Sequence, residues 1–319
     1  IKVKYISIFL IISILIIHAE ERDMKPPRGY LNNTFLKWSA MFGRIDLVNT
    51  KPEIPHDIES FIDVKFKETE QRSLFLDVYR EKGVNNSMPL IIFVHGGSWT
   101  KGDKKDYLIY LLSYAQKGYV TASLSYRFSQ EEKFPAAVKD IICGIKWLKD
   151  NAMEYGIDSN NVAIVGGSAG AHLALMAAYS TGSSFGEESC KSGSASQKVN
   201  AVVNFYGPTD LTTDYAINRK ETNFFIGSDY KSQPEKYLIA SPIHYVTKDD
   251  PPTMTFIGTL DELVPLNQTN KLDQSLKKVD VYHDYHILKG WPHTMDAARP
   301  VNIYTQHYMD KFFNQFLRD

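Results

Sequence analysis

Cysteine, net charge and long apolar runs are all scarce in this sequence. Two cysteines among 319 residues are too few for a dense disulfide framework or for a zinc site built from four thiolates. A formal net charge of −1 argues against a role dominated by nucleic acid or by an anionic membrane. No segment repeats at a fixed period, which excludes collagen-like and solenoid architectures. The remaining composition is that of an ordinary globular protein.

The one long apolar run, residues 5–17, lies behind two lysines at the start of the chain. It is shorter than the roughly 20 residues that span a bilayer, and this layout is typical of a secretory signal peptide. We expect residues 1–19 to be a signal peptide cleaved near Ala19, and the mature chain to be secreted or periplasmic without a stable membrane span. An uncleaved anchor is the alternative. Export would permit a disulfide between Cys143 and Cys190, but spacing alone does not decide whether they meet.

The rest of the chain divides into an irregular, proline-containing N-terminal arm, residues 20–58, and one domain, residues 59–319. In the domain, alternating or β-branched apolar runs predict eight strands, at residues 61–68, 73–80, 89–97, 119–127, 161–167, 199–207, 253–259 and 279–288. Helical spacing predicts helices at residues 108–118, 134–157, 169–179 and 302–317. Strands that alternate with helices predict an α/β fold with a mostly parallel sheet covered on both faces. Two insertions, 180–197 and 212–250, are of the size that often shapes binding sites.

A run of small residues, Gly166-Gly167-Ser168-Ala169-Gly170, joins a predicted strand to a predicted helix. It matches G-x-S-x-G, the pattern of a nucleophilic serine on a sharp strand-to-helix turn. Small neighbours allow the turn to close, and the helix N-terminus favours developing negative charge. We interpret Ser168 as a nucleophile; the alternative is a passive serine in a tight turn.

A second glycine loop, His95-Gly96-Gly97-Ser98-Trp99, follows the third predicted strand. Acyl transfer creates an oxyanion that requires positioned N–H donors. In this type of fold they come from this loop and from the residue after the nucleophile, which predicts Gly97, Ser98 and Ala169. We expect His95 to hold the loop, whereas Trp99 either lines an acyl pocket or packs. The loop lacks the third glycine and the position of a dinucleotide-binding motif.

The order expected for the other two members of a triad is acid, then histidine. Asp261 follows the strand at residues 253–259 and is our predicted acid. Its neighbour Glu262 is one alternative, and Asp210 is another, although we interpret Asp210 as a turn-stabilising residue. His293 lies in the loop after the last predicted strand and is the predicted base.

The other histidines are placed less favourably for this role. His283 and His286 fall inside the last predicted strand, and His307 falls in the terminal helix. His172 lies one helical turn beyond Ser168, so we expect it to pack or to support the site.

The motifs VHGGSW, GGSAG, NFYGPTDL, TLDELVP and WPH, in this order, resemble the α/β-hydrolase carboxylesterases. The likeness is closest to the branch with feruloyl and acetylxylan esterases, the BD-FAE type, which is related to hormone-sensitive-lipase-like esterases. It spans about residues 60–316. The resemblance implies that Ser168 is the nucleophile, Asp261 the orienting acid and His293 the general base, with Gly97 and Ser98 as oxyanion donors. Ser98 stands where the hormone-sensitive-lipase branch has a third glycine, a departure that sets this chain apart from that branch.

The expected function is therefore a secreted serine carboxylesterase that works through an acyl-enzyme and needs no metal or cofactor. The resemblance points to acetyl or feruloyl esters on plant-type polysaccharide, or to small-molecule esters. We expect Trp99 and Trp291 to contact substrate; four other aromatic residues are candidates for an aromatic acyl pocket, namely Phe128, Tyr206, Phe224 and Phe225. The alternatives are a formamidase or amidase with the same triad, and a non-catalytic binding protein on this fold.

Overall fold

The computed structural model describes residues 23–187, 190 and 195–318. The predicted signal peptide, residues 1–19, lies outside them. A single eight-stranded sheet organises the described chain, as predicted, with the spatial order β1-β2-β4-β3-β5-β6-β7-β8. The strands are β1 (Ile58–Glu68), β2 (Ser73–Glu81), β3 (Met88–Val94), β4 (Val120–Leu124), β5 (Ile157–Gly167), β6 (Ala201–Phe205), β7 (Thr253–Gly258) and β8 (His283–Leu288).

The first two strands form an antiparallel extension of an otherwise parallel sheet. β1 pairs antiparallel with β2, and β2 pairs antiparallel with β4, whereas every later pairing is parallel. The strands β4, β6 and β7 are buried along their whole length. Polar residues of these strands, such as Thr121, Asn204 and Thr255, are buried as well, so both faces of the sheet are covered here. β8 begins four residues later than predicted, because Val279 ends the preceding helix and Asp280 turns the chain with a positive φ of 59°.

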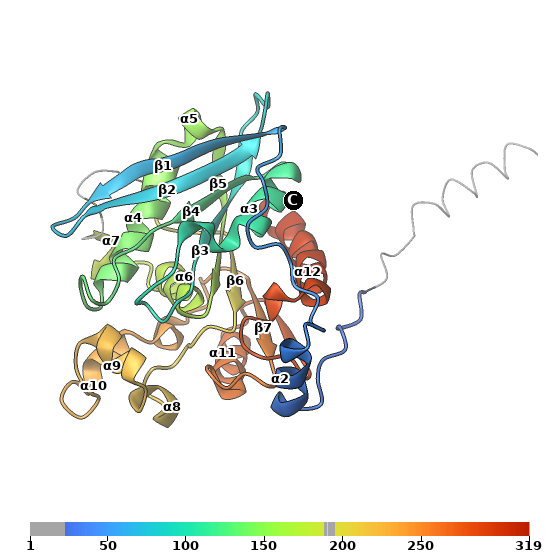
Figure 1. The fold of residues 1–319 in the computed structure, drawn as a ribbon. Coiled ribbons are helices and arrows are strands. Elements are labelled where there is room, and N and C mark those ends of the chain that lie inside the picture. Colours follow the sequence, from blue (N-terminus) through green and yellow to red (C-terminus); the bar gives the residue numbers. More distant parts are fainter. Residues whose placement is uncertain (1–22, 188–189, 191–194, 319) are drawn as a thin grey trace, which may run out of the picture.

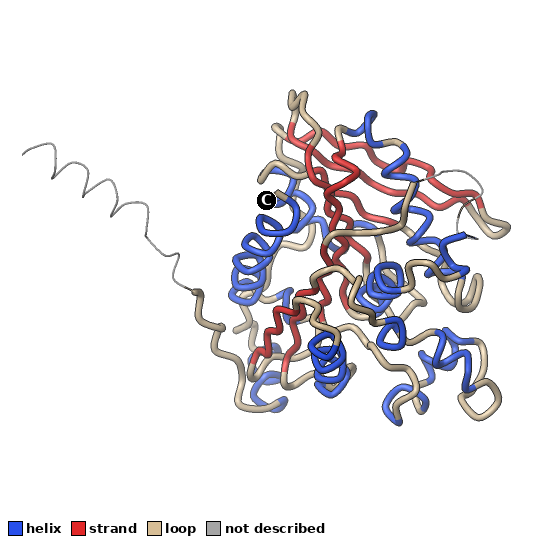
Figure 2. The backbone as a smooth tube through the Cα atoms, turned by 180° about the vertical axis from the view of Figure 1, so that it is seen from behind, coloured by secondary structure: helices blue, strands red, loops and turns tan. Residues whose placement is uncertain are grey.

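Helices cover both faces of the sheet (Figures 1 and 2). The longer ones are α3 (Leu108–Gln116), α4 (Ala136–Asp150), α6 (Ala169–Tyr179), α11 (Leu266–Lys278) and α12 (Arg299–Leu317). One hydrophobic cluster contains apolar side chains of α4, α6 and α11, and a second contains those of α3 and α12. Every residue of α6 is buried, so this helix is held in place on all sides beneath the serine turn.

Shorter helices lie outside this core or connect its elements. They are α2 (Asn33–Met41), α5 (Ala152–Tyr155), α7 (Ser184–Glu187), α8 (Asp214–Ile217), α9 (Lys220–Ile226), α10 (Pro234–Ile239) and the 3-10 helices η1 (Lys104–Tyr107), η2 (Pro242–Tyr245) and η3 (Met295–Ala297). The helices α8 to α10 lie in the predicted insertion 212–250. None of the described helices is long and apolar enough to cross a membrane.

The N-terminal arm runs along the loop that carries His293. The Tyr30 N–H donates to the Gly290 carbonyl at 2.8 Å, and Leu47 forms an isolated antiparallel bridge with Ala298. Arg299 closes an ion pair with Asp46 at 3.0 Å. These contacts place the arm beside the carboxyl end of the sheet.

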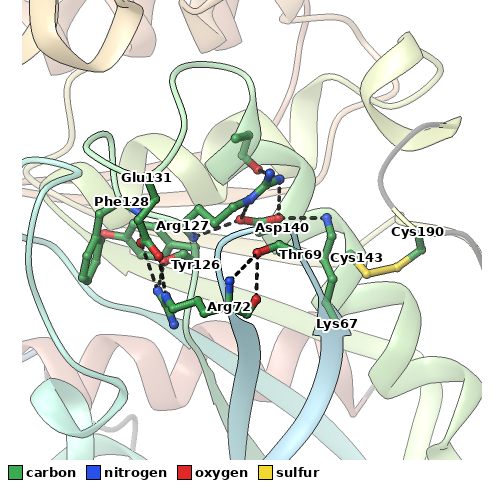
Figure 3. Close-up of polar contacts among 11 residues, drawn as sticks. Lys67, Thr69, Arg72, Tyr126, Arg127, Phe128, Glu131, Asp140, Cys143 and Cys190 are labelled. Atoms are coloured by element: carbon green, nitrogen blue, oxygen red, sulfur yellow. Dashed lines mark hydrogen bonds and ion pairs between the residues drawn. A yellow bond between two sulfur atoms is a disulfide. The ribbon is translucent and has the colours of Figure 1, made fainter.

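The two cysteines form a disulfide, which the sequence had left open. Cys143 lies in α4 and Cys190 in the Ser/Gly-rich insertion, with their Cα atoms 5.2 Å apart (Figure 3). The bond ties this insertion to a core helix. A disulfide is typical of an oxidising compartment, which supports the expected export of the chain.

Candidate active site

Ser168 occupies the sharp turn between β5 and α6. Its φ of 54° and ψ of −121° are uncommon for a residue with a side chain. The Ser168 N–H donates to the Phe205 carbonyl of β6 at 2.9 Å, which fixes the turn to the sheet. A Cβ at Gly166 would lie 2.3 Å from the Gly170 carbonyl oxygen, so the turn closes only with glycine there. The hydroxyl consequently stands at the carboxyl edge of the sheet, at the N-terminus of α6.

His293 lies between this serine and a buried carboxylate. His293 Nε2 is 2.9 Å from Ser168 Oγ, and His293 Nδ1 is 2.6 Å from Asp261 Oδ2. An ionised carboxylate only accepts hydrogen bonds, so Nδ1–H donates to Asp261 and Nε2 accepts the serine hydroxyl hydrogen. This is the tautomer that a general base needs in order to take a proton from the serine.

Asp261 is oriented by the backbone of its own loop. Its Oδ1 accepts the N–H groups of Leu263 at 2.9 Å and Val264 at 2.8 Å, which leaves Oδ2 for His293. The Asp261 side chain is fully buried. With both oxygens engaged, the carboxylate holds one orientation toward the imidazole.

The two alternative acids have other partners. The Glu262 carboxylate accepts a hydrogen bond from the Asn33 amide of α2. Asp210 accepts the N–H of Thr212 at 3.0 Å, the turn-stabilising arrangement expected from its sequence context, and pairs with Lys271 at 2.7 Å.

The glycine loop after β3 faces the serine across a cleft. Gly97, Ser98 and Trp99 have consecutive positive φ values of 105°, 53° and 59°. A Cβ at Gly97 would lie 2.0 Å from the Lys101 carbonyl oxygen, so this tight reversal requires glycine. Gly97, Ser98 and Ser168 line the same cleft. The backbone N–H groups of this loop and of Ala169 are therefore the candidate donors to an oxyanion formed at Ser168.

Neighbouring side chains keep the loop in place. The buried His95 ring stacks on Tyr126 at 4.4 Å between centroids, and burial lowers the pKa of His95. Tyr126 Oη donates to the His95 carbonyl at 3.0 Å, and the Ser129 N–H donates to the Trp99 carbonyl at 2.8 Å. His95 therefore has the structural position expected for it.

The cleft in front of Ser168 has a volume of about 450 Å³ and a wall of mixed polar and apolar groups. Its lining residues beyond the serine, His293 and the glycine loop include Lys101, Asp106, Tyr107, Tyr206, Leu263, Thr294 and Asp296. Tyr206 donates its hydroxyl to the Asp296 carboxylate, and its ring lies 4.5 Å from the His293 ring. Burial raises the pKa of Asp296, so this carboxyl holds a proton more strongly than an exposed aspartate does.

A second, smaller cavity of about 70 Å³ lies on the other side of Ser168. It is lined by Ser98, Trp99, Ala169, Pro208, Tyr215, Arg219, Glu221, Thr222, Leu263 and Val264. The insertion supplies its outer wall, where the Arg219 guanidinium lies over the Tyr215 ring at 5.0 Å and donates to the Glu262 carbonyl at 2.9 Å. The insertion is thereby tied to the loop that carries Asp261.

The two tryptophans predicted to contact substrate have different surroundings. Trp99 lines the small cavity, yet its ring is mostly buried and stacks on Phe225 at 4.4 Å, so it both packs and faces the site. Trp291 lines neither of the two cavities at Ser168. Its Nε1–H donates to the Pro27 carbonyl at 3.0 Å and its ring contacts Tyr30 edge-on, so it fastens the N-terminal arm.

His172 packs as expected. Its Nε2–H donates to the Ala240 carbonyl at 2.7 Å, and its Nδ1 accepts from Trp99 Nε1 at 3.2 Å. Burial lowers the pKa of His172 to about 4.

Sequence reasoning did not select the polar residues of the cleft wall. Asp296 stands three residues after His293, so its position in the sequence could have suggested that it lies near the site. Lys101, Asp106 and Tyr107 have no motif around them, and only the fold brings them to the serine.

Comparison with known proteins supports the fold and the family. The BD-FAE family model matches residues 76–276. The chain is 32% identical over 242 residues to the esterase LipQ of Mycobacterium tuberculosis and 30% identical over 255 residues to its esterase LipC. A truncated carbohydrate esterase from gut microbiota superposes with a TM-score of 0.70 at 23% identity, covering 82% of this chain and 97% of that one.

The curated relatives are longer than the region they share with this chain. The LipQ match covers 72% of this chain but 56% of LipQ, and the LipC match covers 76% and 62%. The chain thus spans little more than half the length of these relatives.

Proposed function

Because the chain belongs to the BD-FAE family of α/β-hydrolases, we propose that it is a carboxylic ester hydrolase with Ser168 as nucleophile. The observation that carries this proposal is the hydrogen-bonded series Ser168, His293 and Asp261 at the end of the sheet. The esterase names of its relatives support the same reaction class. The pairing of Cys143 with Cys190 supports the further proposal that the chain is exported.

The reaction begins when Ser168 Oγ attacks the ester carbonyl carbon and His293 Nε2 takes the hydroxyl proton. The resulting imidazolium is stabilised by the Asp261 carboxylate, and its proton passes to the leaving alcohol as the C–O bond breaks. Water then attacks the acyl-serine by the same route, with His293 again as base, and releases the carboxylic acid.

Backbone N–H groups stabilise the negative charge that develops on the carbonyl oxygen. We assign this role to Gly97, Ser98 and Ala169, whose positions the rigid glycine loop and the start of α6 determine. Each such donor contributes about 3 kcal/mol of transition-state stabilisation in comparable sites.

The two cavities beside Ser168 favour a short acyl group on a polar alcohol. The smaller cavity, of about 70 Å³, is closer in size to an acetyl or propionyl group than to a feruloyl group. The larger cleft, although much of its wall is apolar, includes Lys101, Asp106 and Thr294, which could hydrogen-bond a hydroxyl-bearing alcohol such as a sugar. Of the two substrates inferred from the sequence, acetyl esters are therefore favoured over feruloyl esters.

The first test is hydrolysis of p-nitrophenyl acetate by the chain from Glu20, beside the Ser168→Ala variant. We expect turnover by the wild type and a loss of about 10⁴-fold or more in the variant. Equal rates would show that Ser168 is not the nucleophile. Inactivity of both, on this ester and on acetylated xylan, would favour a binding protein on this fold.

Substrate class is tested by comparing p-nitrophenyl acetate with p-nitrophenyl octanoate, methyl ferulate and an N-formyl arylamide. The small cavity predicts the highest kcat/KM for acetate. A preference for the arylamide would favour a formamidase, and a preference for octanoate or ferulate would contradict the acyl assignment.

Export is tested by N-terminal sequencing of secreted protein, expected to begin near Glu20.

A further inference from the structure

The helix α2 presents its apolar side to solvent. None of its residues is fully buried. Phe35, Trp38 and Phe42 follow the i, i+3, i+7 spacing of one helix face, and all three are more than half exposed. The partly buried positions of α2 are Asn33, Leu36 and Ser39, of which Asn33 contacts the domain through Glu262. The exposure of the apolar face is the reverse of the usual arrangement, in which the apolar face packs on the core.

Further exposed apolar side chains flank this face in the sequence. The docking face, as we call it, consists of Leu31 (81% exposed), Phe35 (56%), Trp38 (56%), Met41 (68%), Phe42 (58%) and Leu47 (58%). The rings of Trp38 and Phe42 stack at 5.5 Å, and a hollow of about 370 Å³ lies among Phe35, Trp38 and Phe42. Apolar patches of this kind on a protein surface usually mark an interaction site.

The charged side chains of α2 and its C-terminal flank are basic, whereas the two acids nearest the docking face have partners of their own: Asp46 pairs with Arg299, and Glu262 accepts a hydrogen bond from Asn33. Residues 31–44 contain Lys37 and Arg44 but no aspartate or glutamate, and both basic side chains are exposed. The net charge of −1 for the whole chain conceals this local excess of positive charge. Aromatic and aliphatic residues with lysine and arginine at their border are typical of helices that lie in a lipid interface.

The docking face lies beside the mouth of the candidate active site. Asn33 donates to Glu262, whose neighbour Leu263 lines both cavities at Ser168. Further along the arm, the Val48 N–H donates to the Ala297 carbonyl at 2.9 Å, and Ala297 lines the larger cleft. In Figure 1, α2 lies next to α11 and β7 at the same end of the molecule.

We propose that α2 docks the protein on an anionic lipid surface, with Phe35, Trp38 and Phe42 in the interface and Lys37 and Arg44 against the headgroups. The basic border selects this occupant over a second copy of the chain, because two copies would bring the same positive charges together. The aliphatic residues Leu31, Met41 and Leu47 favour lipid over a sugar chain, which stacks on aromatic rings. The inference does not depend on the proposed esterase activity.

The test measures binding of the chain from Glu20, which contains every element of the described fold, to vesicles with and without phosphatidylglycerol. We expect co-sedimentation with anionic vesicles, weakened by high salt and reduced on neutral phosphatidylcholine. Trp38 is the most exposed of the four tryptophans, since Trp99 and Trp291 are buried and Trp147 is partly buried. Its fluorescence should therefore shift to shorter wavelength on binding.

Variants connect the binding to the docking face. Phe35→Ser/Trp38→Ser should reduce vesicle partition by about tenfold or more, and Lys37→Glu/Arg44→Glu should remove the preference for anionic lipid. Met153→Ser/Leu238→Ser is the matched control, because it removes two exposed apolar side chains outside α2 and should not change binding. Since α2 has no buried residue, the α2 variants should keep the wild-type melting temperature.

Several outcomes would overturn the proposal. Equal partition of the wild type and the Phe35→Ser/Trp38→Ser variant would show that α2 does not contact the bilayer. Retention on insoluble xylan without vesicle binding would assign the face to a polysaccharide, and a dimer that the same variant dissociates would assign it to a second copy. The Ser168→Ala variant should bind vesicles as the wild type does, so a failure of the proposed chemistry would leave this result unaffected.

Discussion

Two fully buried carboxylates, Asp261 and Asp140, show how differently this fold uses the same chemical group. Asp140, in α4, accepts hydrogen bonds from the N–H and the guanidinium of Arg127, each at 2.9 Å, and pairs with Lys67 at 2.8 Å (Figure 3). Asp261 accepts from two backbone N–H groups and from His293. Both side chains have no exposed surface.

The difference lies in the partner charge. Asp140 is balanced by permanent cations, so its electrostatic contribution is complete once the chain has folded. Asp261 faces an imidazole that gains charge only while it holds the serine proton, so the pair strengthens during the proposed reaction. A buried carboxylate paired with arginine and lysine therefore indicates a structural role. A buried carboxylate paired with a histidine that reaches a serine indicates a catalytic role.

The largest predicted effect concerns Asp261. In Asp261→Asn, the amide still accepts from Leu263 and Val264, so the free energy of unfolding should change by less than about 1 kcal/mol. The amide NH₂ favours the wrong His293 tautomer, and kcat for p-nitrophenyl acetate should fall by about 10⁴-fold. Turnover within tenfold of the wild type would reject Asp261 as the acid and direct attention to Glu262 and Asp210.

The reciprocal substitution, Asp140→Asn, should have the opposite profile. Removing this charge takes a carboxylate away from the mostly buried side chains of Arg127 and Lys67, which should cost about 3 kcal/mol of unfolding free energy. The kcat of the remaining folded protein should stay within about twofold of the wild type, since Asp140 lines neither cavity at Ser168. Denaturant unfolding and kinetics on both variants measure the contrast between Asp261 and Asp140 directly. A loss of kcat in Asp140→Asn without a loss of stability would contradict the structural role of Asp140.

The disulfide that joins Cys143 of α4 to Cys190 allows the stability around α4 to be tested without a change of charge. Cys143→Ser/Cys190→Ser removes a cross-link across 47 positions of sequence, which should lower the free energy of unfolding by about 2–4 kcal/mol. Thermal unfolding with and without reductant checks this. Reductant should lower the melting temperature of the wild type and leave that of the double variant unchanged.

The last effect depends on pH and concerns His172. The folded protein keeps His172 neutral down to about pH 4 because burial lowers its pKa, whereas the unfolded chain protonates it near pH 6.5. Stability from neutral His172 is thus complete above about pH 6.5 and lost as the pH falls toward 4, by up to about 3 kcal/mol. His172→Gln should flatten the pH dependence of unfolding in this window. An unchanged slope would assign the acid sensitivity to other groups.

The linear order of motifs predicted much of the site. Gly166 to Gly170 between a strand and a helix, an acid after the next-to-last strand and a histidine after the last one are local patterns, and each was placed correctly relative to the sheet. For Trp291, two residues before His293, no local feature of the sequence distinguishes a substrate contact from an anchor for the arm. The arm itself supplies its partner, the Pro27 carbonyl, from 264 positions away.

The sequence alone thus determined the eight strands and the family motifs, because apolar periodicity and small-residue turns act over a few neighbouring residues. The tertiary structure alone decided which carboxylate meets His293, that Cys143 meets Cys190, that Lys101, Asp106 and Tyr107 line the larger cleft, and that α2 turns its aromatic face outward. These outcomes depend on contacts between segments far apart in the chain, and their geometry is determined only when the helices and strands pack together.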